Sequence, residues 1–309
     1  MADYIVHKAI EISNISAKTL SKLKAVTRWV VSPKYDGCHA VFAFSDGKHV
    51  GTYSRTGELV RSMDHVAQHL LLRYADRLGC GRWAICGEAW TPGLEFNVIS
   101  GMFRRHSPQL GLKFIPFDIV PWNYNDESTV GPVIRLGEFG SRPYARAYID
   151  RLSDLLGGAY VVDCHVLPLE YSYLIMPFDD AMACAKADAI KYKSQHCYDG
   201  AVLAQAESLY TVGAGKGGEF IKHKPLLSYT VTVTGAALDF GTRTGKNTAA
   251  LKFVLNGLDQ KVSTGLSQEQ VDEITAVGWV GYNIEVEAMG ITVNGYLREP
   301  RFKGIRTDA

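Results

Sequence analysis

The sequence predicts an α+β protein of two domains, a mixed N-terminal domain over about residues 1–226 and an all-β C-terminal domain over about residues 227–309. A chain of 309 residues is too long for one ordinary core and too short for three. Helical and strand patterns alternate through the first part of the chain. From Tyr229 onward, short alternating strands lie between Gly-rich turns, a pattern typical of a small barrel.

The composition sets limits on the class of protein. Apolar residues make up 47% of the chain and charged residues 21%, the balance of a soluble globular protein. The formal net charge is only +1, so any surface that binds nucleic acid must come from local basic clusters. The six cysteines include no CxxC pair, so we expect buried free thiols. Without a signal sequence or an apolar run of about 18 residues, we expect a cytoplasmic protein, in the host cytoplasm if viral, with no membrane partner.

The elements of the N-terminal domain follow from the spacing of apolar residues. A first amphipathic helix is predicted within residues 15–27. Extended runs on both sides of Asp46–Gly47 predict a β-hairpin that ends at Arg55, with Lys34 at the mouth of a strand. The pattern further predicts helices over residues 63–78, 141–156 and 178–195, a basic turn over 101–107, and strands over 83–90, 112–122, 198–205 and 219–225.

The C-terminal domain is predicted to contain one short helix among its strands. Ser267 and Gln270 are spaced as in a capping box, which predicts that the helix begins there. Strands over residues 283–288 and around 291–297 complete the predicted barrel. His65 and His69, four apart on a predicted helix of the first domain, lack an HExxH frame and are interpreted as ordinary helix residues.

A series of short motifs runs along the chain in a fixed order. One KxDG tetrapeptide would arise by chance in about one chain of this length in fifteen. Six or seven pieces in order would not. The pieces are KYDG at 34–37, SRTG at 54–57, GE at 87–88, FIPFD at 114–118, YDGAV at 198–202, FIKHKP at 220–225 and LREPRFKGIRTD at 297–308.

In this order the motifs resemble those of the ATP-dependent DNA ligases of the covalent nucleotidyltransferase superfamily, over nearly the whole chain. The resemblance implies a nucleotidyltransferase (adenylation) domain followed by an OB-fold barrel, in the small two-domain form of some bacteriophage enzymes. It implies sealing of nicks in duplex DNA with ATP and Mg²⁺, for which Mn²⁺ can substitute, by a monomer. Such enzymes serve DNA replication, repair and recombination.

The implied reaction begins at Lys34, which displaces pyrophosphate from ATP to form lysyl-AMP. An amine attacks only when unprotonated, so we expect desolvation or nearby positive charge to lower the pKa of Lys34. Lys222 and Lys224 alternate along one strand, which puts both on one face where they can neutralise the α-phosphate. AMP then passes to the 5′-phosphate of the nick, and the 3′-OH displaces it.

The resemblance assigns roles to further residues. Asp36 would assist near the 3′ end of the nick, Glu88 would hold the ribose hydroxyls, and Phe117 would stack on adenine. Ser32 and Arg55 would belong to the nucleotide site. Asp199, with Glu88, would bind the metal through oxygen, the ligand atom that Mg²⁺ requires. Contacts to DNA are expected from His39, Arg55, Arg104, Arg105, Arg243, Lys246, Arg298 and Arg301.

The chain departs from the family pattern at three positions. Asp199 stands where the family usually has Glu, and Ala309 follows Asp308 where the family has Lys. Arg306, with Asp308 beside it, is therefore expected to orient the pyrophosphate. His39 replaces an arginine, so sealing is expected to weaken as pH rises through the imidazole range. The Arg243 and Lys246 turn is equally compatible with a solvated loop.

Three alternative functions share part of this pattern. An RNA ligase or an mRNA-capping guanylyltransferase would also carry KYDG at 34–37, and a non-catalytic nick-binding protein could keep the scaffold. FIPFD, SRTG and the C-terminal motif favour a DNA ligase. Retention of Glu88 and the lysine pair argues against loss of catalysis.

Overall fold

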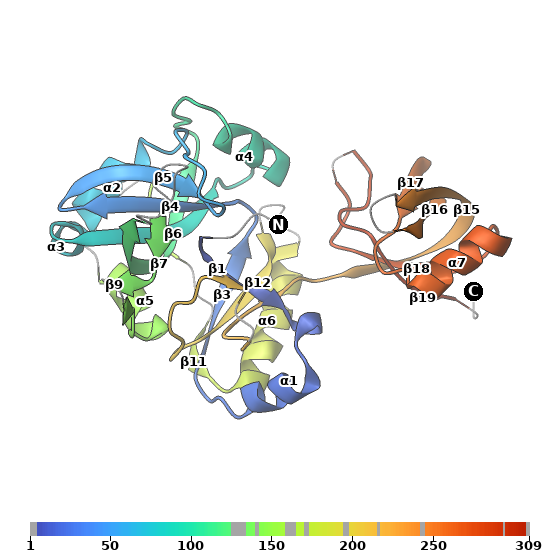
Figure 1. The fold of residues 1–309 in the computed structure, drawn as a ribbon, viewed down its shortest axis with the longest axis horizontal. Coiled ribbons are helices and arrows are strands. Elements are labelled where there is room, and N and C mark those ends of the chain that lie inside the picture. Colours follow the sequence, from blue (N-terminus) through green and yellow to red (C-terminus); the bar gives the residue numbers. More distant parts are fainter. Residues whose placement is uncertain are drawn as a thin grey trace. The chain divides into compact units, whose positions relative to one another are not determined.

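The computed structural model describes residues 5–124, 134–139, 142–157, 165–169, 173–193, 198–214, 217–241, 245–292 and 294–306. The chain divides into two compact units, Met1–Lys224 and Pro225–Ala309, two residues before the expected boundary (Figure 1). The first unit mixes helices and strands and the second is nearly all β, so the protein is α+β as predicted.

One five-stranded sheet of the first unit has the strand order β11-β3-β12-β14-β2. Helix α6 packs on β3 and β12, and Leu23 of α1 joins the same apolar core with Trp29 and Leu203. Ser16 caps α1 by accepting a hydrogen bond from the Thr19 backbone. The elements are β2 (Ile10–Glu11), α1 (Ala17–Lys24), β3 (Trp29–Tyr35), β11 (Tyr173–Met176), α6 (Phe178–Lys193), β12 (Tyr198–Gln205) and β14 (Phe220–His223).

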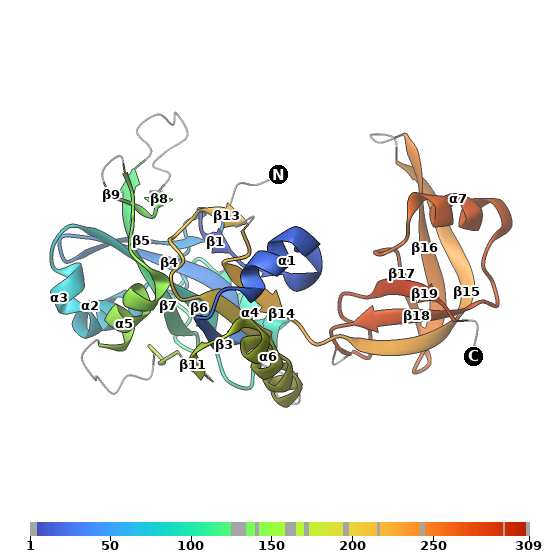
Figure 2. The same cartoon turned by 90° about the horizontal axis from the view of Figure 1, so that it is seen from below.

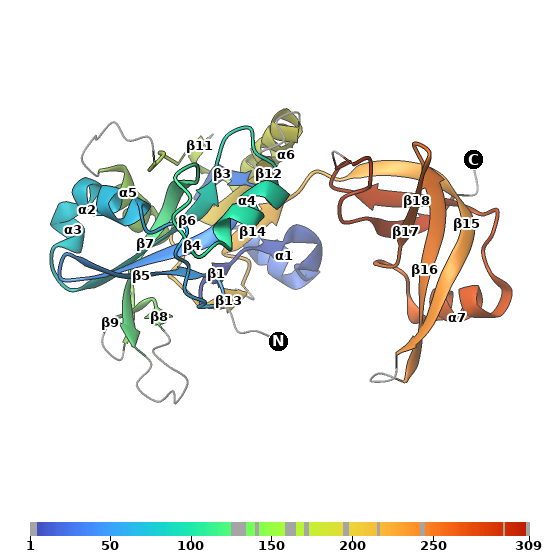
Figure 3. The ribbon, with the colours of Figure 1, turned by 90° about the horizontal axis from the view of Figure 1, so that it is seen from above.

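The second five-stranded sheet has the order β5-β4-β6-β7-β8, and both of its faces are buried. Helices α2, α3 and α5 lie together beside it (Figures 2 and 3). Asp46 and Gly47 have positive φ angles of 49° and 75°, so the predicted Asp-Gly hairpin is confirmed. The elements are β4 (Cys38–Ser45), β5 (Lys48–Ser54), α2 (Val66–Arg73), α3 (Ala75–Leu78), β6 (Arg82–Trp90), α4 (Phe96–Phe103), β7 (Lys113–Tyr124), β8 (Ile134–Leu136) and α5 (Tyr148–Leu156).

Short elements complete the described part of the first unit. Strand β1 pairs with β13, and β9 pairs with β10. The short elements are the 3-10 helix η1 (Ile12–Asn14) and the strands β1 (His7–Lys8), β9 (Glu138–Phe139), β10 (Arg142–Pro143) and β13 (Gly213–Ala214).

Three predictions about helices were wrong in part. The helix expected over 63–78 breaks at Tyr74, whose φ and ψ are −120° and 32° and whose buried hydroxyl donates to Leu155 O. The helix expected from residue 141 begins at Tyr148, because Arg142–Pro143 pairs as a strand. The predicted basic turn over 101–107 begins inside α4, a helix that the sequence did not predict and that buries the side chains of Ile99 and Phe103.

The second unit is a five-stranded sheet of order β17-β16-β15-β18-β19. Its edges meet where Phe302 N donates to Thr264 O at 2.8 Å, and Trp279, Leu251 and Phe253 fill the core. The strand expected at 291–297 is only one bridge, and the last strand is formed by the C-terminal motif. The elements are β15 (Leu227–Gly241), β16 (Lys246–Leu255), β17 (Leu258–Val262), α7 (Gln268–Val277), β18 (Asn283–Ala288) and β19 (Arg301–Ile305).

The cysteines and helices bear on two further predictions. Cys38, Cys80, Cys86 and Cys184 are free thiols, but only Cys86 among these four is buried as expected. Cys38 and Cys184 are half-buried, and Cys80 is exposed because it lies in the turn before β6. Cys164 and Cys197 lie outside the described residues. No helix within the described ranges is long and apolar enough to cross a membrane.

The capping box at α7 is confirmed and provides a test of the barrel unit. Ser267 Oγ accepts from Gln270 N at 3.2 Å, and Gln270 Oε1 accepts from Ser267 N at 2.8 Å. Ser267→Ala leaves a backbone N–H of the first turn unpaired, so we expect the free energy of opening of α7 to fall by about 1 kcal/mol. Native-state hydrogen exchange of α7 peptides measures this. Ser263→Ala, at an exposed nearby position, is the control, and equal protection in both variants would contradict the role of the cap.

Candidate active site

The KYDG motif joins the two large sheets of the first unit. β3 ends at Tyr35 and β4 begins at Cys38, so Asp36 and Gly37 form the link between them. A Cβ on Gly37 would lie 2.2 Å from the Ala89 carbonyl oxygen, so only glycine lets the link pass this close to β6. Asp36 is buried at the junction. The motif therefore places Lys34 on one sheet beside the residues of the other.

Lys34 forms an ion pair inside this junction. Its Nζ lies 2.7 Å from Asp199 Oδ2, and Lys224 Nζ lies 3.0 Å from the same oxygen. Lys222 Nζ lies 3.4 Å from Glu11 Oε1. Asp199 is 5% exposed, so its charge has little solvent to screen it. The structure thus brings together the predicted nucleophile, one predicted metal ligand and the predicted phosphate clamp.

A β-bulge aims Asp199 at Lys34. The pairing of β12 with β3 shifts between Tyr198 and Gly200, which makes Asp199 the extra residue. Gly200 has a φ of 130°, and a Cβ there would lie 2.1 Å from His223 O. Glycine is required at this point because a side chain would meet the backbone of His223 and Lys224.

A second bulge presents Phe117. The pairing of β6 with β7 shifts between Cys86 and Gly87, whose partners are Asp118 and Pro116, so Phe117 has no partner in the ladder. Its ring is half-buried and lies 5.2 Å from the His39 ring at 74°. One part of this aromatic ring therefore remains open beside the site.

The pKa of Lys34 is raised, whereas the sequence predicted that it would be lowered. Desolvation lowers it, but the charges of Asp199, Glu88 and Asp36 raise it by more, so the net direction is upward. The expectation that the surroundings lower the pKa of Lys34 is therefore wrong, because the carboxylates that the protein itself provides raise it. The physical reason is the bulge, which puts a buried carboxylate in contact with the amine.

Asp199 has the character of a cation ligand. Burial opposes its ionisation, but Lys34 and Lys224 lower its pKa by more, so the carboxylate is charged. Its Oδ1 is buried and has no hydrogen-bond partner among the described residues. No group of three or more His, Cys, Asp or Glu side chains that could hold a metal ion occurs in the described ranges. Mg²⁺ commonly keeps waters and substrate phosphates as ligands beside one or two carboxylates.

Glu88 lies across from Lys34 on β6, in register with His39 of β4. Desolvation raises its pKa to about 7, with Lys34 lowering it and Asp36 raising it further, and the Gly37 backbone N–H donates to the carboxylate. Glu88 is therefore only partly ionised near neutral pH.

His39 does not carry the charge that the sequence suggested. Desolvation, with a contribution from Arg55, lowers its pKa to about 3. Its Nε2 is buried with no hydrogen-bond partner within the described part of the chain. The predicted fall of sealing with rising pH therefore does not follow, because the imidazole is neutral throughout the relevant range.

The remaining predicted residues of the first unit lie around the link. Ser32 is in register with Val202 and on the same face of β3 as Lys34. Arg55 is exposed in the turn after β5, and Arg104 is exposed at the C-terminal end of α4. Burial and the charge of Glu88 raise the pKa of the Cys38 thiol to about 11, while the charges of Arg104 and Arg55 oppose this rise. Arg105 follows Arg104 and is also exposed.

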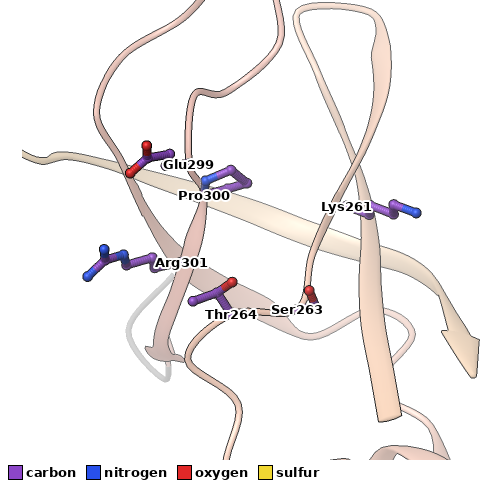
Figure 4. Close-up of a pocket in the computed structure, with 6 residues that line it drawn as sticks. All are labelled: Lys261, Ser263, Thr264, Glu299, Pro300 and Arg301. Carbon is purple, nitrogen blue, oxygen red and sulfur yellow. The ribbon is translucent and has the colours of Figure 1, made fainter. Parts of the chain in front are cut away.

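The predicted residues of the barrel unit are described within that unit alone. Arg301 lines a pocket with Lys261, Ser263, Thr264, Glu299 and Pro300 (Figure 4). Arg306 Nη1 lies 3.3 Å from Glu285 Oε2, and Arg298 N donates to Gly290 O. Lys246 is exposed at the start of β16. Arg243 and Asp308 lie outside the described residues.

The raised pKa of Glu88 makes the stability of the protein depend on pH. Folding favours the protonated carboxyl, so this contribution is present below the ordinary pKa of 4.5 and is lost as pH rises through about 7. Glu88→Gln cannot ionise, so we expect the variant to gain about 2–3 kcal/mol over the wild type between pH 5 and pH 8. Urea denaturation at both pH values measures this, with exposed Glu58→Gln as control. A difference that stays constant with pH would refute it.

Comparison with known proteins finds similar folds but no matching sequence family. No protein-family profile matches the chain, and no curated protein sequence matches it. Among solved structures, a protein called Pmar-Lig_Pre aligns over 99% of this chain and 68% of its own, with 16% identity and a TM-score of 0.71. Pmar-Lig_PreS3 aligns over 98% and 68%, with 17% identity and a TM-score of 0.67.

A structure from a structure–function study of Lig E DNA ligases aligns over 97% of this chain and 98% of its own, with 17% identity and a TM-score of 0.65. That study describes DNA binding with a minimal scaffold. At such identities the similarity shows the fold, and it extends over both units. The chain therefore has the fold of the Lig E DNA ligases, in agreement with its motif series.

Proposed function

We propose that the protein is an ATP-dependent DNA ligase that seals nicks in duplex DNA through lysyl-AMP on Lys34 and a DNA-adenylate, forming a 3′–5′ phosphodiester bond. The observation that supports it most strongly is the contact of Lys34 with Asp199, which lies among Glu88 and Lys224 on a DNA-ligase fold. A surface lysine would not be surrounded by buried carboxylates. This arrangement suits a lysine that handles charged phosphates.

The nucleotide would be held from three sides. The open part of the Phe117 ring suits stacking on adenine, a contact that every base can make. Glu88 accepts hydrogen bonds from ribose hydroxyls in either protonation state. Lys222, on β14, and Lys224, just after the end of that strand, would meet the α-phosphate with positive charge where negative charge develops. Ser32 lies on the same face of β3 as Lys34 and would line the nucleotide site.

Lys34 has to lose its proton before it attacks. Burial first, and then the charge of Lys224, lower the pKa of the neighbouring Lys222; Glu11 opposes this change and Lys34 adds to it. The free Oδ1 of Asp199 would hold Mg²⁺, with Glu88 nearby, and the ion would supply further positive charge toward the phosphates. Lys34 would then be positioned in line with the leaving pyrophosphate.

Nicked DNA would meet the basic residues around the link. Arg55, Arg104 and Arg105 are exposed and would contact backbone phosphates, while buried Asp36 would act near the 3′ end. From the barrel unit, Lys246, Arg298 and Arg301 would add phosphate contacts, and Arg243 would add another. In the first unit, the neutral His39 side chain near Arg55 would also form part of the surface that meets DNA. We propose that the enzyme acts as a monomer in the cytoplasm.

The central test is attachment of AMP to Lys34. After incubation with ATP and Mg²⁺, intact-protein mass spectrometry should show one added AMP in the wild type and none in Lys34→Ala, because that variant lacks the attacking amine. Lys22→Ala, at an exposed lysine of α1, should be labelled like the wild type.

Each other outcome decides against part of the proposal. Labelling from GTP alone would favour a capping guanylyltransferase, and sealing of nicked RNA alone would favour an RNA ligase. No labelling of a folded wild type would favour a nick-binding protein. AMP on Lys34→Ala would place the nucleophile elsewhere.

The C-terminal motif should act in the first step only. We propose that Arg306, with Asp308, orients the pyrophosphate as leaving group, with Lys303 able to contribute. Arg306→Ala should slow self-adenylation about 100-fold, as loss of one preorganised donor does, yet leave sealing of a pre-adenylated nick nearly unchanged. Both rates are measured on one preparation beside Lys252→Ala, an exposed position on β16. Equal loss in both steps would mean that Arg306 binds DNA instead.

A further inference from the structure

A buried ion pair lies directly behind the Phe117 bulge. Arg151 of α5 donates from Nε to Asp118 Oδ1 at 2.7 Å and from Nη2 to Asp118 Oδ2 at 3.1 Å. Arg151 is 0% exposed and Asp118 is 3% exposed. The planar fork of arginine fits both carboxylate oxygens at once, a geometry that lysine cannot provide.

The other polar atoms of the pair are also engaged. Arg151 Nη1 donates to Arg146 O at 2.5 Å and to Ser208 O at 3.3 Å, and Asp118 Oδ1 accepts from Ile119 N at 2.9 Å. The guanidinium lies 5.6 Å from the centre of the Tyr148 ring and 5.8 Å from that of Tyr210. Arg151 thus connects α5, the loop after β12 and the bulge of β7.

Stability alone does not account for this pair. Removing both charges from water is costly, and burial raises the pKa of Asp118 even though Arg151 opposes the rise. Replacing such a pair by apolar side chains of similar volume is often neutral or stabilising. Apolar side chains would not provide a directional two-point contact next to Phe117, which lies outside the β-ladder.

Phe117 is such a residue. The bulge leaves it without a β-ladder partner, so the position of its ring depends on its neighbours. The His39 ring contacts it on the site side, and Asp118, the next residue, is clamped from behind by Arg151. A shift of Asp118 would carry the Phe117 ring with it.

We propose that Arg151 is a positioning residue that, through Asp118, holds the Phe117 ring in the orientation that stacks on adenine. This inference rests on the proposed function. Arg151 touches neither nucleotide nor DNA in this scheme and acts only through the bulge.

The test replaces the whole pair, as Asp118→Leu with Arg151→Met, in a Lys34→Ala background so that ATP binds without reacting. Because both charges go together, the protein should fold with near-wild-type stability in urea denaturation. Its Kd for ATP, measured by calorimetry, should rise roughly tenfold, within the range that base–aromatic stacking supplies. A merely structural pair would leave the affinity of a folded variant unchanged.

A double-mutant cycle with Phe117→Ala decides whether the effect passes through that ring. If it does, removing the ion pair from the Phe117→Ala protein should change the Kd by less than about twofold. Additive losses would overturn the inference, and so would an unchanged Kd in the folded pair variant. The exposed pair Arg28 and Glu207, changed to Met and Leu, is the control, with an unchanged Kd expected.

Four further outcomes are distinguishable. Should the double replacement fail to fold, Arg151→Lys keeps the charge, loses the two-point contact and should raise the Kd in the same way. A wild type that binds ATP but gains no AMP would refute the ligase proposal, while the affinity comparison would still decide the role of Arg151. A wild type that adenylates, with an unchanged Kd in the pair variant, would refute only the inference. Absence of ATP binding in the wild type would overturn both.

Discussion

The carboxylate of Asp199, held between two lysines, is the contact on which the site depends. One oxygen lies 2.7 Å from Lys34 Nζ and 3.0 Å from Lys224 Nζ. It joins side chains from β3, β12 and the end of β14 at almost no exposure, where charge interactions are little screened. Gly200 makes the contact possible, because the bulge brings β12 within reach of the His223 carbonyl. Loss of this carboxylate would leave the half-buried ammonium groups of Lys34 and Lys224 close together with no negative charge between them.

Charge balance in the site is set by carboxylates and lysines that alter one another. Asp199, Glu88 and Asp36 hold the proton on Lys34, while the neighbouring lysines keep Asp199 ionised. Glu88 titrates near neutral pH because it is desolvated among other acids. An ATP triphosphate with its cation would bring both signs of charge into this cluster. The resting arrangement thus favours a charged Lys34, and in the proposed reaction the amine would become reactive once phosphates and cation are in place.

Two β-bulges orient the side chains of Asp199 and Phe117 toward the site. Regular pairing would have put Asp199 and Phe117 on the opposite faces of their strands, since side chains alternate at every residue. An extra residue in β12 and in β7 turns each toward the junction of the sheets. The first bulge is closed by glycine and the second is backed by the Arg151–Asp118 pair. Local irregularity in otherwise regular sheets is therefore what builds this site.

The sequence by itself determined the two-part α+β organisation, the Asp46–Gly47 hairpin and the α7 capping box, because these depend on short-range spacing. Its motifs also singled out Lys34, Asp36, Glu88 and Lys224 as candidate site residues, and the structure brings these side chains together. Only the tertiary structure decided the break at Tyr74, the helix α4, the neutral His39 and the raised pKa of Lys34. Arg151 gave no signal in the sequence, since its partner lies 33 residues away. Burial, charge and ladder register arise between segments far apart in the chain, and no local pattern encodes them.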